Sequence, residues 1–233
     1  NPPDCAPPAG VDYDMWLGPA PSRPFNPNRF HFNFRWFWDY AGGLMSDWGV
    51  HLLNICLWGM GYEWPRSVSS YGGKRVADDN SETPDTQVTV YEFPTYTLIF
   101  EHQMLGALGP YGRPHGMLFS GSEATLIITA DDWELIPEPK RKALEGVKGP
   151  DKGDGRPDHV RNFLDCVKSR RQPVENVEVG HLVSTVAHLG NLAFLTNRQV
   201  VWDAQEERII RNRKANRLVR REYRKPWRLP YTG

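Results

Sequence analysis

The sequence has few cysteines, no net charge and no long apolar run, and each of these absences excludes a class of protein. Its 233 residues hold three cysteines, which are too few and too widely separated for a disulfide framework or a zinc knuckle. Lys and Arg together number 28, as do Asp and Glu, so the molecule is not built to bind a polyanion such as nucleic acid. No apolar run is long enough to cross a bilayer and no signal peptide is visible, so we expect no membrane partner.

Aromatic residues and prolines are abundant instead. Nine tryptophans suggest large buried faces, with a stacking surface for a sugar as the alternative. The start, NPPDCAPPAG, is typical of a linker, and we expect the chain to begin partway through a larger protein. Residues 1–35 therefore predict an N-terminal linker and aromatic loop, and residues 36–233 predict the folded domain.

The order of the predicted elements indicates an α+β fold. A helix over 43–59 precedes strands within 66–76, 86–93 and 95–103, two more strands within 117–137, and a surface loop over 137–156. Helices follow within 159–170 and 180–197, and the last is a basic helix within 208–230. This order favours a large, open, mainly antiparallel sheet with helices packed on one face.

The stretch DWGVHLLN, residues 47–54, places polar side chains in an otherwise apolar helix. Positions 47, 51, 54 and 58 form one stripe of a helix, and apolar residues cover most of the remaining circumference. The pattern predicts a helix buried nearly all round. Its polar stripe must then face partners, a ligand or a cleft, because unpaired buried polar groups are costly.

The D-x-G-x-H motif at 47–51, after YAGG and before a helix ending in W-G, resembles the C-terminal domain of the Gfo/Idh/MocA oxidoreductase family. Four further regions are similar to a Trp-rich bacterial branch of it: VDYDMWLGPAP with NPNRFHFNFRWFWDY, HVRNFLDCVKSRRQPVENVEVGH, HLGNLAFLTNRQVVWD and YRKPWRLP. The resemblance implies a two-domain, nicotinamide-dependent enzyme whose second domain binds substrate and forms the oligomer.

This sequence departs from that pattern in two ways. No G-x-G-x-x-G follows any predicted strand, and the family's Glu-Lys-Pro motif is missing. We therefore expect the second domain alone, without a Rossmann domain, and negligible activity of this chain by itself. NAD or NADP would be bound mainly by a domain absent from this chain.

His51 and Asp47 are the predicted catalytic residues. An imidazole suits the removal of a proton from an alcohol, and a carboxylate one helical turn earlier can orient the ring and favour its charged form. The alternative is a buried His–Asp pair in which the two side chains only serve as hydrogen-bond partners for each other. The resemblance favours the catalytic role. The predicted substrate-binding residues are Asn33, Arg35, Trp38, Tyr40, Asn54 and Tyr111. No histidine pair has ligand spacing with a third donor, so no metal is predicted.

The predicted function is the substrate-binding and catalytic half of an NAD(P)-dependent oxidoreductase that acts on a sugar, polyol or glycoside. One alternative is redox-assisted glycoside cleavage in the same family. Another is a non-catalytic oligomerisation domain, or a module that binds an acidic partner through its basic tail. The source is expected to be bacterial, and cytoplasmic and periplasmic locations both remain open.

We also expect a homo-oligomer, at least a dimer, formed through the outer face of the sheet. Alternation in 86–93 and 95–103 assigns one group of side chains to the helices: Val88, Val90, Leu98 and Phe100. It assigns the other group to the outer face: Thr89, Tyr91, Thr97 and Ile99. The second group is rich in apolar or β-branched surface, and relatives in the family use this face for subunit contacts.

Overall fold

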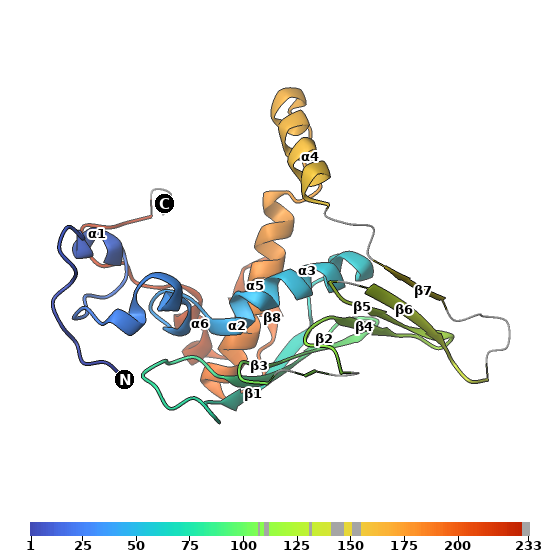
Figure 1. Cartoon of the computed structure of the whole chain (residues 1–233), viewed down its shortest axis with the longest axis horizontal. Helices are drawn as coiled ribbons and strands as arrows, with labels where there is room; N and C mark the ends of the chain where they lie inside the picture. Colours follow the sequence, from blue (N-terminus) through green and yellow to red (C-terminus); the bar gives the residue numbers. More distant parts are fainter. Residues whose placement is uncertain (107, 110–111, 131, 141–146, 151–154, 230–233) are drawn as a thin grey trace. The chain divides into compact units, whose positions relative to one another are not determined.

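The computed structural model describes residues 1–106, 108–109, 112–130, 132–140, 147–150 and 155–229 (Figure 1). The chain divides into two compact units. Unit 1 comprises Asn1–Leu53, Glu63–Leu105 and Val183–Gly233, and unit 2 comprises Asn54–Tyr62 and Gly106–Leu182. Each unit is described by itself below.

The described elements confirm the α+β class. The helices and 3-10 turns are α1 (Tyr13–Leu17), η1 (Pro27–Arg29), η2 (His31–Trp36), α2 (Gly43–Ser46), α3 (Trp48–Met60), α4 (Arg156–Ser169), α5 (Val177–Thr196) and α6 (Arg213–Val219). The strands are β1 (Ser67–Gly73), β2 (Thr86–Glu92), β3 (Thr97–Gln103), β4 (Met117–Ser120), β5 (Ala124–Ile128), β6 (Asp132–Pro137), β7 (Val147–Pro150), β8 (Trp202–Asp203) and β9 (Arg208–Ile209).

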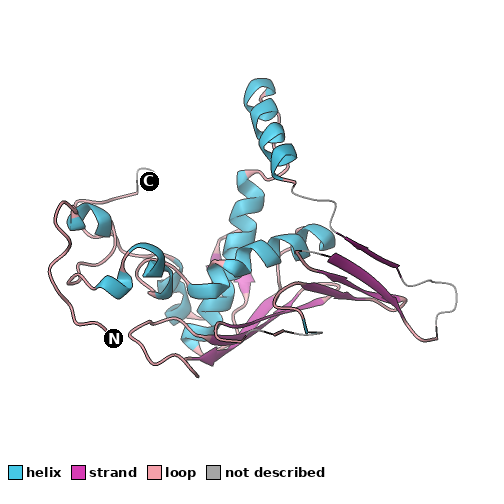
Figure 2. Cartoon of the chain, viewed as in Figure 1, coloured by secondary structure: helices cyan, strands magenta, loops and turns pink. Residues whose placement is uncertain are grey.

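Every described strand pair is antiparallel, and the strands are distributed over three sheets (Figure 2). The order is β1-β2-β3 in unit 1 and β4-β5-β6-β7 in unit 2, with β8-β9 as a small third sheet. Four strands exceed the prediction. Residues 117–137 form three strands instead of two, and β7 lies within the predicted surface loop 137–156. The short strand β8 was not predicted, and β9 lies within the predicted basic helix.

The predicted helix over 43–59 is interrupted and is not buried all round. The turn at Asp47 separates α2 from α3. Along α3, Trp48, His51, Ile55 and Trp58 lie on one exposed face, and the Trp58 side chain is 72% exposed. Leu53 and Leu57 face the interior. The helix therefore carries apolar residues on its exposed side as well as on its buried side.

The inner face of the β1-β2-β3 sheet is covered by α2 and α5, which lie on the same side of it in Figure 1. Tyr91 is fully buried there, and its hydroxyl donates to Met45 Sδ at 3.4 Å. A Cβ on Gly190 of α5 would lie 2.5 Å from the same hydroxyl oxygen, so the helix approaches this closely because that residue is glycine.

The predicted assignment to the two faces is correct for β3, where Leu98 and Phe100 face inward and Ile99 faces outward, but it is wrong for β2. Tyr91 pairs with Leu98 and Thr89 with Phe100, so these residues share the buried face. Val90 pairs with Ile99 on the outer face, where Ile99 is 64% exposed. Alternation shows which residues of one strand point to the same side. The register between two strands decides which of their residues share a face.

A row of polar side chains runs across the buried face of this sheet. Gln87 Nε2 donates to Ser70 Oγ at 2.9 Å, and Ser70 Oγ lies 2.7 Å from Thr89 Oγ1. The Nε2 atom of His102 lies 3.2 Å from Gln87 Oε1. Burial lowers the pKa of His102 to about 4. The ring is therefore neutral at physiological pH, and it completes a chain of hydrogen bonds among buried groups.

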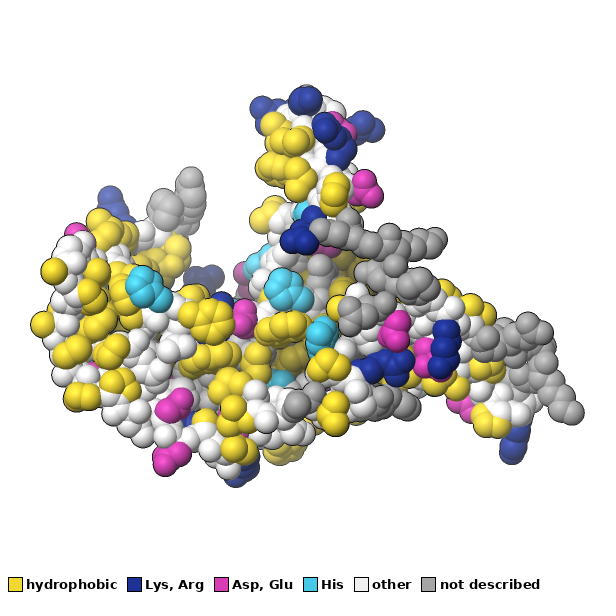
Figure 3. Space-filling view, viewed as in Figure 1, with side chains coloured by type: hydrophobic (Ala, Val, Ile, Leu, Met, Phe, Trp, Pro, Cys, Tyr) yellow, Lys and Arg dark blue, Asp and Glu magenta, His cyan; other side chains and the backbone are white. Residues whose placement is uncertain are grey.

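In unit 2, α4 leaves its apolar side uncovered, and hydrophobic side chains gather along it in the space-filling view (Figure 3). The exposed members are Val160, Phe163, Leu164 and Val167.

Within the described residues, no helix is both long enough and apolar enough to span a membrane.

The basic C-terminal region does not form the predicted continuous helix. It contains β9, the seven-residue helix α6 and an extended tail. In that tail Arg224 donates to the carbonyl oxygens of Asp14, Gly18 and Ala20 and to the Asp14 carboxylate. This arginine caps the C-terminal end of α1, so its charge is used in a contact within the protein.

Asp85 organises the segment between β1 and β2. Its buried carboxylate accepts hydrogen bonds from the backbone N–H groups of Arg75, Val76 and Ala77 and from the hydroxyl of Thr86. Burial alone would raise the pKa of Asp85, but these donors outweigh it and lower the pKa to about 2.

We therefore predict that Asp85 stabilises the fold above pH 4 and loses this effect as the pH falls from about 4 to 2. Asp85→Asn should lower the free energy of unfolding at pH 7 by about 2 kcal/mol, because the ionised form is favoured in the folded state. Urea unfolding followed at several pH values measures this difference, which should shrink below pH 4. The exposed Asp78→Asn is the control, and equal losses in both variants would contradict the prediction.

Candidate functional site

The site is built around the two glycines that begin α2. The carbonyl oxygen of Gly42 accepts a hydrogen bond of 2.8 Å from Asn191 Nδ2 on α5, and Asn191 is 3% exposed. Gly43 has a φ of +65°, and a Cβ there would lie 2.7 Å from Thr83 Cβ. Both positions exclude a side chain, so the YAGG sequence fixes the course of the chain just before Asp47.

Asp47 lies in the break between the two helices and forms an ion pair with Arg35. The residue ends α2, with its backbone N–H donating to the Gly43 carbonyl at 3.0 Å. Arg35 Nε lies 2.9 Å from Asp47 Oδ2, yet this buried N–H makes no hydrogen bond. The contact is thus one of charge, because the distance is short while the N–H is not directed at the oxygen.

Arg35 itself is held by the aromatic loop. Its Nη1 donates to the carbonyl oxygen of Phe32 at 2.5 Å. The centre of the guanidinium lies 4.0 Å from the Phe32 ring centroid and 5.2 Å from that of Phe34. Phe32 is 68% and Phe34 37% exposed. The arginine therefore lies among aromatic rings that face solvent, an arrangement suited to stacking on a sugar ring.

His51 lies one turn into α3 and is exposed. Within the described residues, no hydrogen bond or ion pair joins its ring to Asp47, whose carboxylate contacts Arg35 instead. The structure thus brings Asp47 together with Arg35, while the imidazole of His51 is open to a ligand. A ring in this position can accept a proton from a bound hydroxyl group.

Three other predicted residues of unit 1 have structural partners. Asn33 Nδ2 donates to Asn28 Oδ1 at 3.0 Å, and Trp38 Nε1 donates to the Glu82 carbonyl at 3.1 Å. Tyr40 packs against Trp16, with ring centroids 5.0 Å apart. Burial raises the pKa of Tyr40 to about 12, and its buried hydroxyl has no hydrogen-bond partner among the described residues. These contacts anchor the aromatic loop.

The remaining predicted residues belong to unit 2. Asn54 accepts a hydrogen bond of 3.1 Å from the hydroxyl of Tyr62, which also lies 3.5 Å from Glu175 Oε1. Tyr111 lies outside the described residues.

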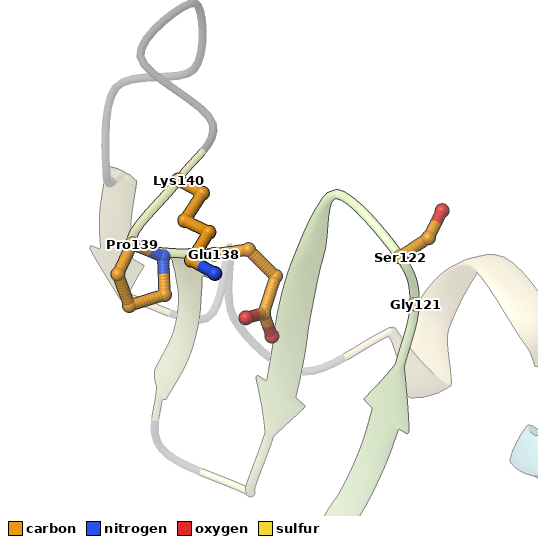
Figure 4. Close-up of a pocket in the computed structure, with 5 residues that line it drawn as sticks. All are labelled: Gly121, Ser122, Glu138, Pro139 and Lys140. Carbon is orange, nitrogen blue, oxygen red and sulfur yellow. The ribbon is translucent and has the colours of Figure 1, made fainter.

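Unit 2 also has an open surface recess lined by Gly121, Ser122, Glu138, Pro139 and Lys140 (Figure 4), and no predicted site residue lines it.

Two residues of the site were missed by sequence reasoning. Asn191 and Thr83 set the position of Gly42 and Gly43, although each is distant from them in the chain. An asparagine in the middle of the apolar stretch LGNLAF was the available signal, because a buried amide needs a partner.

Among the described residues, no group of three His, Cys, Asp or Glu side chains is placed to hold a metal ion.

The arrangement does not provide a dinucleotide site. Such a site requires parallel strands joined by a helix whose N-terminus meets the pyrophosphate, and all described strand pairs here are antiparallel. The described residues therefore do not form a Rossmann-type site for a nicotinamide dinucleotide. They offer the exposed imidazole of His51 and, four residues before it in the chain, an aspartate paired with an arginine that two aromatic rings border.

Comparison with known proteins identifies the fold. A family model described as "Oxidoreductase family, C-terminal alpha/beta domain" of the Gfo/Idh/MocA group matches residues 3–97 and 115–229. Among the curated proteins, none matches the chain. A putative NADPH-dependent oxidoreductase from Desulfitobacterium hafniense is similar in structure, with a TM-score of 0.59, 16% identity, and coverage of 72% of this chain and 51% of that one.

Two other solved structures are similar to the same extent. A levoglucosan dehydrogenase in complex with NADH and L-sorbose has a TM-score of 0.57 and 12% identity, with coverage of 72% of this chain and 52% of that one. A putative oxidoreductase from Thermotoga maritima has a TM-score of 0.56 and 17% identity, with coverage of 70% and 48%. At these identities the likeness is one of fold, and the chain spans about half the length of the solved structures it matches.

We predict that Gly43→Ala destabilises the fold by at least about 2 kcal/mol. The new Cβ would meet Thr83, and the positive φ would add strain of about 1 kcal/mol. Gly10→Ala is the matched control, because Gly10 has a φ of +82° but no neighbouring atom within 4 Å. Thermal or urea unfolding compares the two variants, and equal losses would show that the contact with Thr83 is unimportant.

Proposed function

The chain belongs to the Gfo/Idh/MocA oxidoreductase family, and we propose that it is the substrate-binding and catalytic half of an NAD(P)-dependent enzyme that acts on a sugar, polyol or glycoside. The observation that carries the proposal is the exposed imidazole of His51, one turn into α3 and four residues after Asp47, which forms an ion pair with Arg35. The solvent-facing rings of Phe32 and Phe34 beside that pair support a ligand with a ring to stack on.

In this proposal His51 accepts the proton of the substrate hydroxyl group on a ring nitrogen. Asp47 stabilises the resulting imidazolium by its negative charge, which is the usual contribution of a carboxylate near a protonated histidine. The nicotinamide cofactor is held by a domain other than this chain, because no described residues form a dinucleotide site. This division of labour agrees with a chain that spans about half the length of its structural relatives.

We predict that His51→Ala, made in the complete enzyme, lowers kcat by a factor of about 10² to 10⁴, because general-base catalysis typically contributes that much. The melting temperature should change little, since the His51 side chain is exposed. Steady-state kinetics and thermal unfolding measure the two effects. His159→Ala, which removes an exposed histidine of α4, should leave both unchanged. A His51 variant that melts many degrees lower yet turns over normally would favour a structural role.

We further infer that the outer face of the β1-β2-β3 sheet forms the contact of a homo-oligomer, at least a dimer. Tyr71, Val88 and Ile99 lie on this face, with exposed fractions of 68%, 39% and 64%. Tyr71 pairs with Val88 across the strands, and Val90 pairs with Ile99, so the apolar surface is continuous across all three strands. A stable dimer buries on the order of 1,000 Å² or more, and a multi-stranded face can supply it.

The combined change Tyr71→Lys and Ile99→Lys should therefore give a folded monomer, because charges on this face oppose its burial in a contact. Light scattering measures the mass, and circular dichroism establishes that the sheet is intact. The control is Val76→Lys, an exposed apolar residue outside the strands. If the unmodified chain is already a monomer at high micromolar concentration, the assembly proposal is wrong.

A further inference from the structure

Asp47 has a single carboxylate, and two cations compete for it. In the proposed function the Asp47 carboxylate stabilises the protonated His51 ring. In the structure, Arg35 Nε lies 2.9 Å from Asp47 Oδ2. The two side chains are partly shielded, with exposed fractions of 19% for Arg35 and 32% for Asp47. At this degree of burial an ion pair is stronger than one in open solvent, so the competitor cannot be neglected.

The guanidinium of Arg35 is restrained on three sides. The carbonyl oxygen of Phe32 accepts its Nη1–H, and the rings of Phe32 and Phe34 border the cation. Arg35 therefore has little freedom to follow the carboxylate if Asp47 turns toward His51. Its Nε–H makes no hydrogen bond at the 2.9 Å contact, so the pair relies on charge and lacks the directed bonds of a bidentate clamp.

Few other titratable groups are present where these elements meet. The turn η2 packs against α2 and contains His31 besides Arg35, while α2 contains no titratable side chain. The unit 1 part of α3 contains only His51. Downstream of η2, Asp39 and Glu82 both contact Arg23, with nitrogen–oxygen distances of 2.9 Å. Within the described residues, Arg35 is thus the cation in contact with Asp47, and His51 is the titratable group that follows it on α3.

We propose that Arg35 is a positioning residue that holds the Asp47 carboxylate, so that Asp47 supports His51 only when this pair opens. The proposal rests on the proposed function, since it concerns the same site. It assigns Arg35 a role different from binding the substrate directly. While the pair is closed, His51 acts without its carboxylate partner, and when the pair is open, Asp47 stabilises the protonated ring.

A double-mutant cycle on this chain tests the proposal without measuring turnover. The titration of the His51 ring is followed by NMR, and its signal is assigned by its loss in His51→Gln. Asp47→Asn is made in the unmodified chain and in Arg35→Met, which removes the charge but keeps an apolar side chain between the two rings. The cycle isolates the effect of Asp47 from the direct effect of losing the arginine charge.

We expect Asp47→Asn to leave the titration midpoint of His51 nearly unchanged in the unmodified chain. In the Arg35→Met background the same change should lower the midpoint by about 1 pH unit, because the released carboxylate there stabilises the charged ring. Arg35→Lys restores the cation, so in that background Asp47→Asn should again have little effect. Arg66→Met removes an exposed arginine of unit 1 and should behave as the unmodified chain.

Two results would overturn the proposal. An equal shift on Asp47→Asn in the unmodified chain and in the Arg35→Met background would mean that Arg35 does not govern Asp47, and no shift in any background would mean that Asp47 never reaches His51. If Arg35→Met fails to fold, Arg35→Gln replaces it as the background without the cation, and the same two results contradict the proposal there. Normal turnover of His51→Ala would reject the proposed function while leaving the outcome of this cycle unaffected.

Discussion

The contact between Asn191 and the backbone of Gly42 determines where the helix that carries His51 begins. The amide of Asn191 donates to the Gly42 carbonyl from within the core, and Thr83 occupies the space that a side chain on Gly43 would need. Because both partners are buried, the direction of the backbone after Gly42 and Gly43 is fixed. Asp47, its contact with Arg35 and the exposed His51 come directly after this fixed point in the chain.

The sequence predicted the components of this region but not their connection. Spacing identified a helix near residues 43–59 and selected Asp47 and His51, since both lie in one apolar stretch with a helical period. It could not predict how Gly42 and Gly43 are held, because their partners Asn191 and Thr83 are distant in the chain. The side chains of β2 were assigned to the wrong face for a similar reason: the register of β2 against β3 pairs residues of opposite parity.

The aromatic loop explains why so many rings occur before α2. Trp16, Phe25, Phe30 and Tyr40 pack in a chain of edge and tilted contacts with centroid distances of 5.0–5.2 Å. Asn26 links this cluster to the N-terminal segment through the Pro2 carbonyl and the Asp4 carboxylate. The loop is thus a packed scaffold despite its lack of long helices, and it presents Phe32, Phe34 and Arg35 at a fixed place beside Asp47.

The polar row beneath the β1-β2-β3 sheet has a consequence for how the strands find one another during folding. Ser70, Gln87 and Thr89, with the Nε2 atom of His102, make these side-chain hydrogen bonds only in the observed alignment. A slip of one residue between β1 and β2 would turn the amide of Gln87 outward and leave hydroxyl groups without partners in the core. An apolar inner face would accept several alignments at similar energy. Hydrogen bonding in the interior thus rejects misaligned pairings that hydrophobic burial alone would tolerate.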